Sequence, residues 1–212
     1  MNAKINSCHE PSRNQQLLDL IRCQGIVRSR DAQVLGIPGV YLARLHRRGA
    51  IDRIGRGLYT LPDHEYTEHH SLAEVSVRAP NSVVCLLSAL RFHGLTTQSP
   101  HEVWIAIGRT RRAPKCDYPP LQVHWISNES LLVGVETHRV EGVSVRITSQ
   151  ARTVADCFKF RSVVGSDIAV EALRDFLGRH NNQHTELWEM AKHCRVTTVI
   201  RPYLEALSVC SI

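Results

Sequence analysis

The stretch GIPGVYLARLHRRGAIDRIGRGLYTLP, residues 36–62, decides the fold of the first third of the chain. It predicts a helix from residue 38 or 39 to about 48, because proline is tolerated in a first helical turn and a glycine follows the run. Residues 51–54 and 58–61 alternate in polarity around a Gly-Arg-Gly turn, which indicates a β-hairpin. A helix followed directly by a hairpin is therefore expected here.

The residues before this stretch predict two more helices. Ser12 and Gln15 have the spacing of a capping box, and apolar residues at helical spacing follow until Gly25. Ser29 is expected to cap a second, short helix over residues 30–35. Helix, short helix, glycine-containing turn and helix is the order of a helix-turn-helix, and the hairpin that follows is typical of a wing.

The third predicted helix has two different faces. Leu42 and Leu45 fall on one stripe at 100° per residue, whereas Arg44 and Arg47 fall on the other side. Guanidinium groups on an outward helix face bind guanine edges in a major groove or phosphates. The predicted DNA-binding residues of this helix, the wing and their neighbourhood are Arg28, Arg30, Tyr41, Arg44, Arg47, Arg48, Arg53 and Arg56. A solvated basic helix face is the plain alternative.

The distribution of charge supports a nucleic-acid interpretation. Residues 1–62 contain ten basic and four acidic side chains, a net charge of +6 that equals the formal net charge of all 212 residues. The remainder is therefore neutral. A small basic unit joined to a neutral one is typical of a nucleic-acid-binding module with a second function attached.

The rest of the chain predicts a second domain of mixed structure. Residues 62–70 are polar and are expected to form a linker between a domain over 1–62 and a domain over 71–212. The expected elements are helices at 71–79 and 83–92, the latter capped by Ser82, then strands at 103–107, 122–126, 133–138 and 143–147, then helices at 151–158, 169–177, 185–193 and 196–207, with Pro202 as a kink. The predicted fold class is α+β: a winged helix-turn-helix followed by a mixed α+β C-terminal domain.

Composition excludes several classes of protein. With 43% hydrophobic and 22% charged residues the chain is neither disordered nor fibrous. The longest apolar run has five residues, far below the roughly 18 that span a bilayer. The first ten residues hold no apolar signal core, and the seven cysteines form no C-x-x-C pair. We therefore expect a cytoplasmic protein with reduced thiols.

Neither catalysis nor metal binding is predicted. The histidines at 64, 69 and 70 lie close in sequence, but no cysteine stands at zinc-ligand spacing. Ser166 and Asp167 follow a glycine as in a nucleotidyltransferase motif, yet the next acids have helical spacing instead of the i, i+2 spacing that holds Mg²⁺, so Ser166 is interpreted as a helix cap. No Asp or Glu stands two residues before a lysine, as a nuclease would require. No cofactor, catalytic residue or metal ligand is therefore expected.

The order of four motifs resembles a known family. GIPGVYLARLHRRGAIDRIGRGLYTLP, followed by LLSALRFHGL at 86–95, VWIAIG at 103–108 and SQARTVADCFKFR at 149–161, is similar to AbiEi-type antitoxins, the regulators of type IV toxin–antitoxin systems. The resemblance covers residues 15–177. Its C-terminal family positions are Ser88, His93, Arg152 and Asp156, and it assigns them no role. Their spacing alone predicts helix-terminal hydrogen bonding for His93 and a surface ion pair for Arg152 and Asp156.

The resemblance implies a function. An antitoxin of this type binds double-stranded DNA at inverted repeats of its promoter, represses its own operon and counteracts a nucleotidyltransferase toxin without forming a stable complex with it. Two alternatives stay open. The first is a stand-alone winged-helix repressor whose second domain binds an effector, and the second is a DNA-targeted nuclease.

Overall fold

The computed structural model describes residues 12–179 and 184–209. The chain divides into two compact units, residues 1–68 with 141–143 and residues 69–140 with 144–212, which we call the N-terminal and C-terminal units. Helices and strands are mixed throughout, so the predicted α+β class is confirmed.

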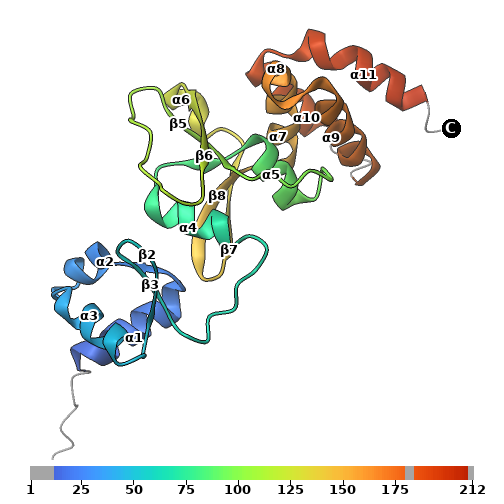
Figure 1. Ribbon diagram of the computed structural model, residues 1–212. Coiled ribbons are helices and arrows are strands. Elements are labelled where there is room, and N and C mark those ends of the chain that lie inside the picture. The colour runs from blue at the N-terminus through green and yellow to red at the C-terminus, as the bar shows by residue number, and fades with distance from the viewer. Residues whose placement is uncertain (1–11, 180–183, 210–212) are drawn as a thin grey trace, which may run out of the picture. The chain divides into compact units, whose positions relative to one another are not determined.

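Three helices begin the N-terminal unit (Figure 1): α1 Arg13–Gln24, α2 Ser29–Val34 and α3 Val40–Arg47. The predicted cap of α1 is confirmed, because Ser12 Oγ accepts a hydrogen bond from the backbone N–H of Gln15 at 3.3 Å. The Gln15 side chain donates instead to Asp19, so only half of the expected capping box forms. Gly25 follows α1 with a positive φ of 71°, a conformation that glycine adopts without strain.

The cap of α2 differs from the prediction. Ser29 is the first residue of the helix, and its N-cap is Arg28. The carboxylate of Asp31 accepts a hydrogen bond from the Arg28 backbone N–H at 3.0 Å and also binds the Arg28 guanidinium. The cap therefore comes from a carboxylate in the first helical turn, which the helix dipole favours.

The predicted hairpin is present as β2 Asp52–Gly55 and β3 Leu58–Thr60. A two-residue strand that was not predicted, β1 Val27–Arg28, pairs antiparallel with β3 and completes a sheet of order β1-β3-β2. The sequence pattern missed β1 because two residues are too short to show alternation. The core of the unit consists of apolar side chains from all three helices, from β1 and from the segments on either side of α3: Leu17, Ile21, Val27, Ala32, Ile37, Leu42, Leu45 and Ile51.

The C-terminal unit contains a five-stranded sheet of order β6-β5-β4-β8-β7. Its strands are β4 Val83–Val84, β5 Val103–Gly108, β6 Leu121–Ile126, β7 Val135–Val140 and β8 Val143–Thr148. β5 pairs parallel with β6 and antiparallel with β4, and β4 pairs parallel with β8. All six residues of β5 are buried, as expected for a strand covered on both faces.

One predicted helix begins too early. Residues 83–92 were expected to be helical, but Val83 and Val84 form the central strand β4, and α5 Leu86–His93 begins only after Cys85. Ser82 is therefore not its cap. Both valines are β-branched and fully buried, so the sheet places them where the local pattern allowed a helix.

Helices make up the remainder of the C-terminal unit: α4 His70–Arg78, α6 Asn128–Leu131, α7 Gln150–Lys159, α8 Arg161–Val164, α9 Ser166–Arg179, α10 His184–Cys194 and α11 Thr197–Val209. The short helices α6 and α8 were not predicted. Ser166 is the first residue of α9, and Pro202 lies inside α11. α7 contacts α5, α9, α10 and α11, so it lies at the centre of the helical layer (Figure 1).

Over the described ranges, no helix combines the length and the apolar character that a bilayer span requires.

Candidate nucleic-acid interface

Helix α3 presents a mixed basic and apolar face to solvent. Leu42 and Leu45 are buried in the core of the N-terminal unit. The exposed side chains on the opposite side of the helix are Val40, Ala43, Arg44 and Arg47. At 100° per residue these four positions fall within one third of the helix circumference. We call them the outer face of α3.

Tyr41 lies between two guanidinium groups. The guanidinium carbon of Arg44 is 5.4 Å from the centroid of the Tyr41 ring, and that of Arg13 is 5.7 Å from it. Arg13 also donates to the Tyr41 hydroxyl at 3.5 Å. Cation–π contacts of this kind hold a long side chain in place before a ligand binds. Arg13 was not among the predicted residues, since only the packing of α1 against α3 brings it to Tyr41.

The two predicted arginines at the start of α2 lie in different environments. The Arg28 guanidinium lies 2.7 Å from the Asp31 carboxylate, and both side chains are largely buried. Burial raises the pKa of Asp31, but the hydrogen bonds and charge of Arg28 outweigh it and hold that pKa below its usual value. Arg28 would therefore have to exchange Asp31 for a phosphate to contact DNA. Arg30, by contrast, is exposed.

The hairpin carries two exposed guanidinium groups. Arg53 lies on β2 and donates through Nε to the Gly55 carbonyl at 3.2 Å. Arg56 occupies the turn between β2 and β3, where Gly57 has a positive φ of 73°. The Gly57 carbonyl accepts a hydrogen bond from the backbone of Ser29 at 2.9 Å, so the turn is tied to the start of α2.

Most exposed arginines of this unit form no ion pair with an acid. Two arginines of residues 12–68 form ion pairs with acids of that range, Arg22 with Asp19 and Arg28 with Asp31. The six predicted arginines that form none there are Arg30, Arg44, Arg47, Arg48, Arg53 and Arg56. Uncompensated cations at a protein surface are the usual electrostatic footprint of a phosphate-binding protein.

The side chains at the C-terminal family positions form hydrogen bonds and an ion pair inside the fold. Ser88 Oγ on α5 accepts a hydrogen bond from the backbone N–H of Trp104 at 2.9 Å, which joins α5 to β5. His93, at the end of the same helix, donates through Nε2 to the Thr148 carbonyl at 2.8 Å. Burial lowers the pKa of His93, so its neutral form is favoured. Ser88 and His93 thus bind different partners and do not form a nucleophile–base pair.

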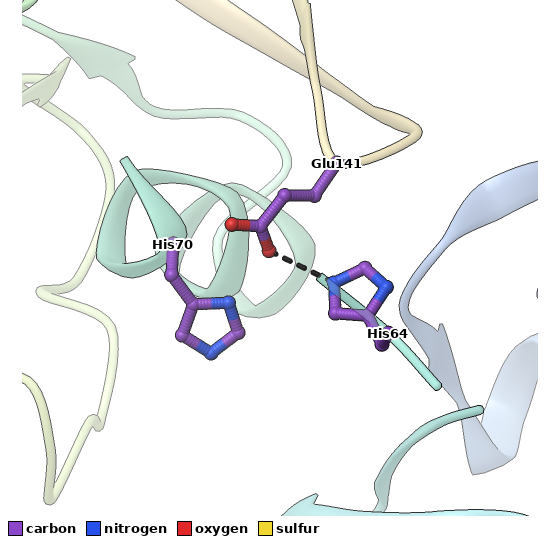
Figure 2. Close-up of side chains that lie close together, drawn as sticks. All are labelled: His64, His70 and Glu141. Carbon is purple, nitrogen blue, oxygen red and sulfur yellow. Dashed lines mark hydrogen bonds and ion pairs between the residues drawn. The ribbon is translucent and has the colours of Figure 1, made fainter. Parts of the chain in front are cut away.

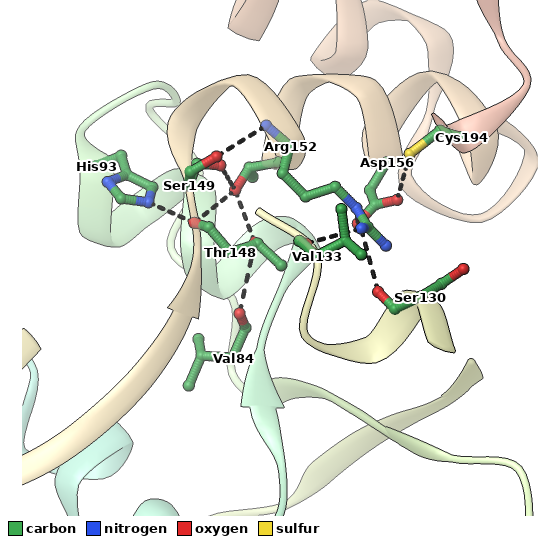
Figure 3. Close-up of polar contacts among 10 residues, drawn as sticks. Val84, His93, Ser130, Val133, Thr148, Ser149, Arg152, Asp156 and Cys194 are labelled. Atoms are coloured by element: carbon green, nitrogen blue, oxygen red, sulfur yellow. Dashed lines mark hydrogen bonds and ion pairs between the residues drawn. The ribbon is translucent and has the colours of Figure 1, made fainter. Parts of the chain in front are cut away.

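Arg152 and Asp156 form a buried ion pair (Figure 3). Their side chains are 2% and 1% exposed, so the predicted surface ion pair is wrong in its location. Arg152 also donates to the carbonyls of Ser130 and Val133, at 3.2 and 2.9 Å. Cys194 on α10 donates through Sγ to Asp156 Oδ1 at 3.2 Å, and burial together with the Asp156 charge raises the pKa of this thiol to about 12.

Hydroxyl groups extend this network to the sheet. Ser149 Oγ accepts from the Arg152 backbone N–H at 3.3 Å and caps α7. Thr148 and Thr153 are 2.7 Å apart through their hydroxyl oxygens, and both are buried. Ser149 and Thr153 lie within the motif SQARTVADCFKFR together with Arg152 and Asp156. No sequence signal indicated the contacts of Cys194 or Ser130, which come from other helices. The whole set in Figure 3 connects α7 with β8, α6 and α10.

The histidines that were considered as metal ligands are distributed over both units. His64 donates through Nε2 to the Glu141 carboxylate at 2.9 Å, within the N-terminal unit (Figure 2). His69 and His70 belong to the C-terminal unit. The cysteines at 85, 116, 157 and 194 are thiols that form no disulfide.

These features define the class of the N-terminal unit: a basic three-helix unit with a hairpin. Residues 15–62 match the family described as transcriptional regulator, AbiEi antitoxin. The match confirms the family resemblance for this unit. No curated protein matches the chain.

A solved structure shares the fold over most of the chain. The crystal structure of the RV2827C protein from Mycobacterium tuberculosis superposes with a TM-score of 0.54 and 14% identity, over 93% of this chain and 80% of that one. At this identity the likeness concerns the fold alone.

Proposed function

We propose that the N-terminal unit is a winged helix-turn-helix that binds double-stranded DNA. The outer face of α3 carries the proposal, because two guanidinium groups without acidic partners project from a helix whose other side is anchored in the core. A helix fits the major groove, where arginine binds guanine. The family match over residues 15–62 supports this role.

The wing arginines have a different task in this proposal. Arg53 and Arg56 lie on the hairpin and not on α3, so they contact the phosphate backbone beside the groove. Arg48 directly follows α3 and also serves the backbone. Contacts to phosphate position the protein without reading sequence, whereas Arg44 and Arg47 read base edges.

The chain acts, in this proposal, as an antitoxin that represses its own operon at promoter inverted repeats. The C-terminal unit counteracts a nucleotidyltransferase toxin without a stable complex and has no catalytic activity of its own. Its polar family positions support a scaffolding role, because Ser88, His93, Arg152 and Asp156 are all occupied by hydrogen bonds inside the fold.

A mobility-shift titration tests DNA binding. The full chain is titrated on the duplex upstream of its own gene and on a scrambled duplex of equal composition, at two salt concentrations. We expect selective binding that persists at the higher salt concentration. The double variant Arg44→Ala/Arg47→Ala should lose selectivity, whereas Arg201→Ala, which breaks an exposed ion pair of α11, should bind like the parent. Equal binding to both duplexes that disappears at higher salt contradicts sequence-specific binding.

Antitoxicity needs a separate experiment. Co-expression with a neighbouring nucleotidyltransferase gene should restore growth, and an affinity-tagged chain should not co-purify the toxin. If growth is not restored by a well-expressed chain, the antitoxin role is wrong even where the DNA-binding role holds.

A further inference from the structure

Two apolar side chains interrupt the basic surface of α3. Val40 is 52% exposed, and Ala43 is exposed beside it, although both positions lie on the same face as Arg44 and Arg47. Neither side chain belongs to the core cluster of the N-terminal unit. The outer face therefore combines two methyl-bearing side chains with two guanidinium groups.

The first turn of α3 is sterically open. The N-cap residue is Gly39, and a Cβ placed at Gly39 or at Gly36 would meet nothing within 4 Å. Because no side chain at these two glycines flanks Val40, a flat or convex partner can approach it closely. Tyr41, which is partly buried and packs against Arg44, borders the same turn.

The chemistry of a DNA groove suits such a face. Hydrogen-bond donors and acceptors dominate the major groove, and its apolar feature is the C5-methyl group of thymine, which alanine and other small apolar side chains contact. Guanine edges bind arginine in the same groove. A face with methyl groups between guanidinium groups thus complements a site in which thymine adjoins guanine.

We propose that Val40 and Ala43 are specificity-determining residues that select thymine by its C5-methyl group. This inference rests on the proposed DNA binding and deepens it: Arg44 and Arg47 supply the guanine contacts, and the two apolar side chains select the neighbouring thymines. In this proposal Val40 and Ala43 contribute as much to the recognition of DNA sequence as Arg44 and Arg47 do.

Removing a single methyl group from the DNA tests the proposal. Binding duplexes are first selected from a randomised pool with the full chain. Each thymine of the selected site is then replaced in turn by deoxyuridine, which differs only in lacking the C5-methyl group. At one or two positions the affinity should fall about fourfold, as expected for one buried methyl group.

Protein variants assign that loss to the two residues. Val40→Thr preserves the shape of the side chain and Ala43→Ser preserves its Cβ; each should bind the thymine duplex more weakly and discriminate less against deoxyuridine at its own position. Val34→Thr is the matched control, because Val34 is 86% exposed but lies on α2. It should retain full discrimination. Circular dichroism verifies that all three variants are folded.

Several outcomes overturn the inference. Deoxyuridine duplexes that bind as tightly as thymine duplexes at every position exclude methyl recognition while leaving the proposed DNA binding intact. Unchanged discrimination in both variants assigns the methyl contact to other residues. A Val40→Thr variant that dissociates an oligomer in sedimentation shows instead that Val40 binds a second copy of the chain. If no duplex is enriched from the pool, the proposed DNA binding fails as well.

Discussion

Arg152 Nε lies 2.8 Å from Asp156 Oδ2, one helical turn further along α7, and both side chains are almost completely buried. A buried ion pair is tolerated when hydrogen bonds satisfy its remaining polar atoms. Here the Ser130 and Val133 carbonyls accept from Arg152, and the Cys194 thiol donates to Asp156. The pair therefore links α7 to the segment before β7 and to α10.

Breaking this pair should destabilise the fold strongly. Asp156→Ala leaves the Arg152 charge buried without a counter-ion, which is expected to cost about 3–5 kcal/mol in the free energy of unfolding. Urea denaturation followed by circular dichroism measures it. Asp156→Asn is a milder variant for the case that Asp156→Ala does not fold.

The exposed ion pair between Arg201 and Glu205 serves as the control for that experiment. Arg201→Ala should change the free energy of unfolding by less than about 1 kcal/mol, because solvent screens exposed pairs. Similar losses for Asp156→Ala and Arg201→Ala would contradict a structural role of the buried pair.

Removal of the Asp31 carboxylate should weaken the start of α2. Asp31→Ala deletes the acceptor of the Arg28 backbone N–H and is expected to cost about 1–2 kcal/mol. Because the pKa of Asp31 is lowered in the folded state, its contribution is complete above the unfolded pKa of about 3.9 and disappears as the pH falls through the folded value. Urea midpoints measured at pH 7 and pH 3 test both expectations. A loss that is equally large at both pH values would refute the carboxylate mechanism.

His93 should make stability depend on mildly acidic pH. Burial lowers its pKa in the folded state, so the unfolded chain takes up a proton at higher pH than the folded chain does. The stabilising contribution of neutral His93 is therefore complete above its ordinary pKa of about 6.5 and is lost as the pH falls towards the folded value. Thermal melts between pH 7.5 and pH 5 should show this decline.

The variant His93→Gln should reduce that decline without abolishing it. His124 and His193 also have pKa values lowered by burial, and they continue to disfavour the folded state at acidic pH. An unchanged pH profile in His93→Gln would show that His93 does not contribute.

The two groups of arginines should behave differently on DNA. Arg47→Ala on the outer face of α3 is expected to weaken binding to the selected site by about 1–3 kcal/mol and to relax specificity at one position. Arg56→Ala in the hairpin turn should weaken all sequences alike and reduce the salt slope by about one. Fluorescence anisotropy titrations at several salt concentrations separate the two effects. The same response in both variants would contradict this division between base and phosphate contacts.

Elements with local signals were predictable. The periodicity of residues 13–24 and 40–47 and the turn between residues 51 and 61 yielded α1, α3 and the hairpin, because helical stripes and glycine turns depend on neighbouring residues. β4 was not predictable in this way. Val83 pairs with Ala106 and Val84 with Ile147, so only partners far along the chain make them a strand.

The environments of side chains were likewise predictable only where neighbouring residues decide them. The exposure of Arg44 and Arg47 agrees with their position opposite the apolar stripe of the helix, which the sequence shows by itself. The sequence pattern assigned the cap of α2 to Ser29, so the ion pair between Arg28 and Asp31 was not predicted. The burial of Arg152 and Asp156 was also missed, because their i, i+4 spacing is the same for a surface pair and a core pair.

The sequence by itself determined where the charge lies and which segments are amphipathic, since both are properties of residues near one another in the chain. The tertiary structure decided which polar groups are buried and which remain available for a ligand. Burial depends on what packs over a segment: α5, α9 and α10 pack against α7, on which Arg152 is 2% exposed, whereas no described element of the N-terminal unit covers the outer face of α3. The same residue type, arginine, is therefore buried in an ion pair at position 152 and exposed to solvent at positions 44 and 47.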